Sequence, residues 1–283
     1  MEWITTPLEH AVGGDTVIWR YMDLAKFISM LSTGLWFTRG ASFRDDPYEG
    51  FCEASHRDFP VDEYGPGPPV LKEPATISFA RLIAEASYAN AEVCRNARAH
   101  LYVNSWCLTN ESMAMWQIYG PPPYGVAVTS TVDKYQRALK IPPSFRQQVL
   151  FGKVKYHDDL AVSPEIRRDF SDGAIPLGPK CFERVLTLGL HKRSCYKYET
   201  EWRAVLYQDP KPEVSGVQIP VDLDQMISSV YVAPRAEDFF VEVVSSIMDK
   251  FSLRKPLESS SLLAAPLRKQ DRDILPTPTK PVV

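Results

Sequence analysis

Residues 198–207 read Tyr-Glu-Thr-Glu-Trp-Arg-Ala-Val-Leu-Tyr, an alternation that predicts a β-strand. Aromatic and β-branched residues favour strands, and neighbouring side chains on a strand point to opposite faces. We therefore expect Glu199, Glu201 and Arg203 on one face, and Trp202 on the other as an anchor in the core. Two carboxylates beside a guanidinium belong either to a solvated strand edge or to an active-site carboxylate with its support.

Short strand patterns recur on both sides of this stretch and are separated by helical patterns of uneven length. We expect further strands at 16–21, 35–38, 101–108, 124–129, 149–156, 217–220 and 229–232. Helical patterns cover 24–33, 78–99, 111–119, 178–192 and 235–252. The spacing is not the regular strand–helix–strand repeat of a doubly wound parallel sheet. The expected fold class is therefore α+β, with mixed or antiparallel sheets of short strands and flanking helices.

A single domain is expected over residues 1–263. A chain of 283 residues with 45% hydrophobic composition is long enough to bury one full core. Residues 60–74 contain five prolines and two glycines, which indicates a surface loop or lid. Residues 264–283 carry four prolines and mixed charges, which indicates a flexible tail.

The composition limits the partners and cofactors to be expected. The formal net charge of -3 gives no electrostatic reason to expect binding to nucleic acid or to an anionic membrane. A local basic groove is still compatible with this net charge. The five cysteines form no CxxC pair, which argues against a disulfide framework and a structural zinc site. The five histidines form no HExxH motif, which argues against a histidine-rich metal centre. The first residues, Met1–Ile4, show neither the basic nor the apolar region that is typical of a signal peptide, and no apolar run reaches the ~18–20 residues that span a membrane. A cytoplasmic protein without a metal is expected.

Arg20 and Ser105 are the first candidates for contacts with a ligand. Arg20 ends a strand pattern between two aromatic residues, and its planar guanidinium suits bidentate recognition of phosphate. The alternative is an arginine that only extends from the strand end into solvent. Ser105 places a small hydroxyl on an otherwise apolar strand face, where it either contacts a ligand or bonds to local backbone.

Aromatic and basic residues supply the other candidates. Trp116 and Tyr119 lie three residues apart on a predicted helix and share a face. Such a pair either fills core, the better prediction for Trp116, or forms a wall on which a flat ring stacks. Tyr119 precedes a glycine and three prolines, so its hydroxyl is expected to reach a cleft. Lys192 lies just ahead of the glutamates and either binds a phosphate or balances their charge.

In these motifs and their order, the chain resembles a bacterial family named domain of unknown function 2971, across about residues 17–262. That family implies no activity. The chain departs from it at Gly120-Pro121-Pro122-Pro123, where a polar turn with a basic residue is more usual. The matching segments are Ile18–Tyr21, Leu35–Thr38, Phe43–Gly50, Ser105–Leu108, Met115–Tyr119, Gly125–Val128, Lys192 and Tyr198–Arg203.

The order of a strand arginine, a strand serine and a Glu-x-Glu strand is also similar to the layout of mono-ADP-ribosyltransferases. The resemblance implies an ADP-ribosyltransferase-like fold, with Arg20 contacting the phosphate or ribose of NAD and Ser105 bracing the nicotinamide pocket. It further implies that Glu201 holds the 2′-hydroxyl of the nicotinamide ribose and that Glu199 helps to position the acceptor. The chain departs from this layout because Ser105 does not begin a Ser-Thr-Ser triplet.

Three functions follow from these motifs. The first is an NAD-using enzyme that cleaves the nicotinamide–ribose bond and transfers ADP-ribose to an unknown acceptor. Its transition state resembles an oxocarbenium ion, which a fixed carboxylate stabilises without a metal. The second is a non-catalytic ligand- or partner-binding domain on the same scaffold. The third is a metal-dependent nuclease or hydrolase, whose irregularly spaced ligands would be Asp45, Asp46, Glu49 and Glu199.

Overall fold

The structure of the protein is a computed structural model that describes residues 6–43, 46, 97–142, 149–158, 185–208 and 214–263. The proline-rich loop at 60–74, the tail at 264–283 and most of the helix expected at 78–99 lie outside these residues. Asp45 and Glu49 of the acidic turn also lie outside them. The expectation of a single domain over residues 1–263 stays a prediction.

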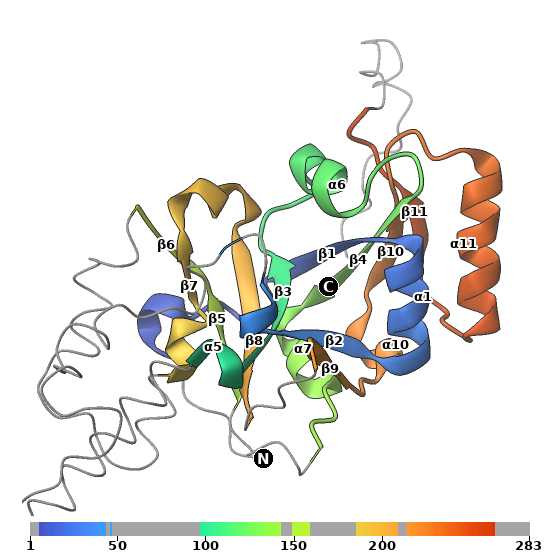
Figure 1. Ribbon diagram of the computed structural model, residues 1–283. Helices are drawn as coiled ribbons and strands as arrows, with labels where there is room; N and C mark the ends of the chain where they lie inside the picture. The colour runs from blue at the N-terminus through green and yellow to red at the C-terminus, as the bar shows by residue number, and fades with distance from the viewer. Residues whose placement is uncertain are drawn as a thin grey trace, which may run out of the picture.

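The described residues form a mixed α+β fold around a mostly antiparallel sheet, which confirms the expected fold class (Figure 1). Its strands lie in the order β11-β10-β4-β1-β3-β2-β9, while β8 pairs with β3 and carries β5 on its outer side. A separate parallel pair joins β6 and β7. The strands are β1 (Val17–Asp23), β2 (Leu35–Arg39), β3 (Leu101–Cys107), β4 (Gly125–Thr131), β5 (Val149–Lys153), β6 (Lys155–His157), β7 (His191–Arg193), β8 (Glu201–Tyr207), β9 (Gly216–Ile219), β10 (Ser229–Val232) and β11 (Leu257–Ser259).

Helices flank this sheet, and α1 illustrates how local sequence sets their ends. The Asp23 side chain accepts a hydrogen bond from the backbone N–H of Lys26 at 2.7 Å and so caps the first turn. Gly34 ends the helix with a φ of 98°, a conformation that glycine adopts without strain. None of the helices in the described ranges is long and apolar enough to cross a bilayer. The helices are α1 (Leu24–Thr33), α5 (Ala97–His100), α6 (Met113–Tyr119), α7 (Val132–Ala138), α10 (Leu223–Met226) and α11 (Asp238–Lys250), with 3₁₀ turns η1 (Leu8–His10), η2 (Gly40–Ser42) and η3 (Ser194–Glu199).

The sheet forks at its central strand, β3. On one edge, β3 pairs with β8 along its whole length. On the other edge, β1 meets β3 through the pair Trp19↔Cys107, whereas β2 meets it farther along, through Thr38 and Arg39. β1 and β2 therefore diverge from one edge of β3, and α1 connects them. We call the opening between these two strands the fork.

The core holds Trp202 on the opposite face of β8 from Glu201, as the alternation predicts. Trp202 is almost fully buried, stacks on Phe151 at 5.7 Å between ring centroids, and meets Tyr135 edge-on at 5.1 Å. Stacked and edge-to-face aromatic pairs add about 0.5–1.5 kcal/mol each beyond the burial of their area. This packing holds the strand that carries Glu201 in a rigid position.

Three sequence expectations about the region around β8 are wrong. The solvated-edge interpretation fails because β8 lies between β3 and β5 and every one of its residues is buried. Glu199 is not on the strand at all: it ends η3, and Thr200 follows in the left-handed conformation with a φ of 44°. In addition, residues 191–193 form β7 rather than continue a helix, because they pair with β6.

Candidate functional site

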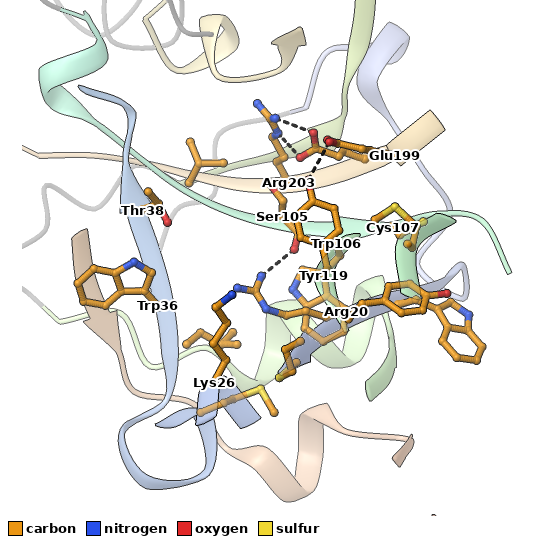
Figure 2. Close-up of a pocket in the computed structure, with 18 of the residues that line it drawn as sticks. Arg20, Lys26, Trp36, Thr38, Ser105, Trp106, Cys107, Tyr119, Glu199 and Arg203 are labelled. Carbon is orange, nitrogen blue, oxygen red and sulfur yellow. Dashed lines mark hydrogen bonds and ion pairs between the residues drawn. The ribbon is translucent and has the colours of Figure 1, made fainter. Parts of the chain in front are cut away.

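A cavity of about 780 Å³ opens at the fork and continues over β8 (Figure 2). Its lining comes from β1, α1, β2, β3, α6, β7, η3 and β8. Six of the seven residues that sequence reasoning selected line this cavity, although they are widely separated along the chain: Arg20, Ser105, Tyr119, Lys192, Glu199 and Glu201. The seventh, Trp116, is fully buried, and its indole Nε1 donates to a Glu111 carboxylate oxygen at 2.9 Å. Trp116 is therefore core, while the ligand-binding roles of the other six stay predictions.

Glu201 is held by two cations at the inner end of the cavity. Arg203 donates to both carboxylate oxygens, from Nε to Oε2 at 2.7 Å and from Nη2 to Oε1 at 2.8 Å. Lys192 donates to Oε1 at 2.9 Å. All three side chains are buried, and the bidentate pair with Arg203 fixes the orientation of the carboxylate.

Glu199 reaches the same cluster from η3 rather than from the strand. Its Oε2 accepts a hydrogen bond from Lys192 at 2.5 Å, and its Oε1 accepts one from the Tyr119 hydroxyl at 2.8 Å. The left-handed backbone at Thr200 joins η3 to β8, so the two glutamates converge even though they belong to different elements. α6 contributes Tyr119 to this cluster.

The two carboxyl groups differ in protonation. Burial alone would raise the pKa of Glu201, but Arg203 and Lys192 outweigh it and hold that pKa well below its usual range. Burial and the neighbouring Glu201 raise the pKa of Glu199 to about 7, although Lys192 opposes the shift. At neutral pH the cluster therefore keeps Glu201 ionised, while Glu199 is close to half-protonated and suited to exchange a proton.

Glu199→Gln is expected to remove a pH dependence of stability between about pH 4.5 and pH 7. Because the pKa of Glu199 is higher in the folded protein than in the unfolded chain, only the folded state keeps this proton across that window. The free energy of unfolding of the wild-type protein should therefore fall as pH rises through it, relative to the variant. Urea unfolding of both proteins across this range measures the difference, and parallel curves would contradict the raised pKa.

Arg20 occupies the fork itself. Its Nη1 donates to the backbone carbonyl of Ser105 at 2.7 Å, as Figure 2 shows. Burial lowers the pKa of the guanidinium from its ordinary value, yet an arginine stays charged. Among the residues that the structure describes, no carboxylate forms an ion pair with Arg20. One of its five N–H donors serves Ser105, which leaves donors for a ligand.

Two supporting residues were missed by sequence reasoning. Asn104 connects β3 to β2: its Nδ2 donates to the Trp36 carbonyl at 2.9 Å, and its Oδ1 accepts from Trp106 and Tyr135. An asparagine inside an otherwise apolar strand pattern is the sequence signal that would have indicated the supporting role of Asn104. The hydroxyl of Tyr156 accepts a hydrogen bond from the backbone N–H of Glu201 at 2.8 Å. No local sequence pattern predicts this contact, because the two residues belong to distant segments.

The described residues do not assemble the other chemistries considered. In those ranges, no group of three or more histidine, cysteine, aspartate or glutamate residues is placed to hold a metal ion. Asp46 is buried and forms an ion pair with Arg193 at 3.0 Å. Cys107 lines the cavity, but burial raises the pKa of its thiol, which also lies 2.8 Å from the Thr109 hydroxyl. A protonated thiol is a poor nucleophile.

Comparisons with known proteins leave the family of the chain open. No family model and no curated protein matches it, so the resemblance to domain of unknown function 2971 stays a prediction. Among solved structures, it is similar to DarT of Thermus sp. 2.9 in complex with NAD+, with a TM-score of 0.35 and 10% identity, over 90% of this chain and 98% of that chain. The same protein in complex with carba-NAD+ gives a TM-score of 0.34 and 10% identity, over 88% and 96%. A likeness of this degree supports no conclusion about function, which must come from the site.

Proposed function

We propose that the cavity binds NAD, cleaves its nicotinamide–ribose bond and transfers ADP-ribose to an acceptor. The observation that carries this proposal is Arg20, a half-buried guanidinium without a carboxylate partner in the described ranges. A cation removed from water without a counter-ion is costly, and an anionic ligand offsets that cost. A pyrophosphate suits such a site, because a guanidinium binds phosphate oxygens in a bidentate manner.

The glutamate pair supplies the chemistry that the cleavage requires. The electron pair of the bond between ribose and nicotinamide moves to the nicotinamide nitrogen, and positive charge develops on the ribose. An ionised carboxylate beside that charge stabilises the transition state more than the ground state. Glu201 suits this role because Arg203 and Lys192 keep it ionised and fixed.

Glu199 suits the second half of the reaction. The acceptor attacks the ribose carbon that nicotinamide has left, and its nucleophilic group must lose a proton. A carboxyl group with a pKa of about 7 accepts that proton near neutral pH and releases it afterwards. Tyr119 orients Glu199 through the hydrogen bond from its hydroxyl at 2.8 Å.

Arg20→Met is expected to weaken NAD binding by about tenfold to a hundredfold, because it removes charge-assisted hydrogen bonds to phosphate. The free energy of unfolding should stay unchanged or rise, since the variant loses a desolvated charge that the folded protein does not compensate. Isothermal titration with NAD and urea unfolding measure the two quantities. A variant that binds NAD as tightly as the wild-type protein contradicts the role of Arg20.

A non-catalytic nucleotide-binding domain is the second candidate. It is favoured because hydrogen bonds within the protein already occupy most acceptor positions of the Glu201 carboxylate. A carboxylate offers about four acceptor positions. Arg203 and Lys192 already make three hydrogen bonds to this one, and Glu199 bonds to it as well. A carboxylate engaged so fully is also suited to a purely structural role.

Incubation with NAD separates the two candidates. Free nicotinamide is measured by chromatography, and the melting temperature is measured with and without NAD, because a ligand that binds the folded state raises it. Stabilisation with nicotinamide release supports the enzyme, whereas stabilisation without release supports the binding domain. A protein that NAD neither stabilises nor reacts with contradicts both.

A further inference from the structure

Trp36 is an exposed tryptophan of β2, at the edge of the cavity where β2 pairs with β9. It is 39% exposed and lines the same cavity as Arg20 and Glu199. In Figure 2, Trp36 and Glu199 lie on opposite sides of Arg20. The exposed part of an aromatic ring that lines a cavity is an apolar surface on which a flat ligand ring can stack.

The indole ring of Trp36 is supported from one side by β9. Trp36 pairs with Gln218 across the two strands, and Gly216 is the diagonal neighbour on β9. A Cβ atom added to Gly216 would lie 2.5 Å from ring atoms of Trp36, so the ring covers the backbone at this glycine. The Trp36 carbonyl is held in turn by Asn104 at 2.9 Å. The ring is thus fixed on one side and accessible on the other.

The order of groups along the cavity matches a nucleotide. In Figure 2, an aromatic platform at Trp36 is followed by the guanidinium of Arg20 and then by the carboxylate of Glu199. Lys192 joins Glu199 to Glu201. NAD presents the adenine base on its ribose, then the diphosphate, then the nicotinamide ribose at which the reaction occurs. Arg20 supplies the phosphate contact, so the ring that lies on the Trp36 side of the phosphates is the base.

We propose that Trp36 is the platform on which the purine ring of the bound nucleotide stacks. This inference rests on the proposed function and names a residue that binds the end of the ligand remote from the bond that breaks. Stacking on an aromatic side chain needs only a flat ring, which the fixed indole provides with little loss of conformational entropy. Trp36 therefore determines which nucleotides bind, and not the chemistry at the ribose.

Binding of two overlapping fragments of NAD to Trp36→Ala tests the proposal by isothermal titration. ADP-ribose, which contains the purine, should bind the variant about tenfold to a hundredfold more weakly, as loss of one stacked base predicts. Nicotinamide mononucleotide, which lacks the purine, should bind with an affinity within about twofold of the wild-type value. Trp36→Phe keeps a flat ring and should recover most of the affinity for ADP-ribose.

Phe239→Ala is the matched control, because Phe239 is 50% exposed on α11 and does not line the cavity. It should change neither affinity. If Trp36→Ala weakens the binding of ADP-ribose and of nicotinamide mononucleotide equally, or weakens neither, the role of Trp36 is overturned. NAD turnover is then judged separately. If ADP-ribose binding depends on Trp36 but NAD is never cleaved, the platform stands and the catalytic proposal fails. Wild-type protein that does not bind ADP-ribose overturns the platform.

Discussion

Glu201→Gln is expected to slow nicotinamide release from NAD by about a thousandfold, the cost of losing one fixed charge that acts mainly in the transition state. The amide keeps the shape of the side chain but does not stabilise positive charge on the ribose. Affinity for NAD should change by less than about tenfold, because the phosphates and the base are bound elsewhere in the cavity. Single-turnover release of nicotinamide and a binding titration measure the two effects.

Glu199→Gln is the matched control for this experiment, since it places the same substitution in the same cluster. It should impair transfer to an acceptor more than nicotinamide release, because Glu199 is assigned the acceptor's proton. Melting temperatures of both variants show whether the fold is intact. Unchanged turnover by Glu201→Gln would reject Glu201 as the catalytic carboxylate and favour the non-catalytic binding domain.

Arg203→Met is expected to lower the free energy of unfolding by about 3–5 kcal/mol, the usual cost of breaking a buried ion pair by removing one partner. Arg203 is 1% exposed, donates twice to Glu201, and also donates from Nη1 to the Gly189 carbonyl at 2.8 Å. Methionine fills much of the same volume but leaves Glu201 with less compensation and the carbonyl without this donor. Urea unfolding, with midpoint and slope fitted together, measures the loss.

Arg137→Met makes the same substitution on the surface of α7. Arg137 forms an ion pair with Asp133 at 3.1 Å, with the two side chains 71% and 49% exposed. Exposed pairs of this kind contribute about 0–1 kcal/mol, so this variant should unfold almost as the wild-type protein does. Similar losses for the two variants would mean that burial of the cluster around Glu201 is not what makes Arg203 important.

Local sequence was sufficient to predict the elements that local interactions form. The Asp23 cap and the Gly34 terminus placed α1 correctly, and hydrophobic patterns located most strands of the sheet. β7 shows the limit of such reasoning. His191, Lys192 and Arg193 have little preference for a strand, and they form one because they pair with β6, a contact between distant segments. The candidate site shows the same limit: the sequence indicated its residue types but not the contacts between them.

The sequence did not predict that the two glutamates differ in backbone position and in the pKa of their carboxyl groups. The alternation predicted both on one strand face, whereas a left-handed residue at Thr200 places Glu199 on η3 instead. Protonation depends on which charges are near: Lys192 lies between the two carboxylates, and Arg203 pairs with Glu201. Such distances are set by packing, so no pattern in 198–207 predicts a pKa of about 7 for one carboxyl and a strongly lowered pKa for the other.

By itself, the sequence determined that Glu201 and Arg203 share a face of β8 and that Trp202 lies on the other, because alternation is a property of the extended backbone. Only the tertiary structure decided that this face is buried and lines a cavity. β8 became an inner strand through its pairing with β3 and β5, and the divergence of β1 and β2 opened the fork that admits Arg20. Both depend on contacts between segments far apart in the chain, which no local pattern encodes.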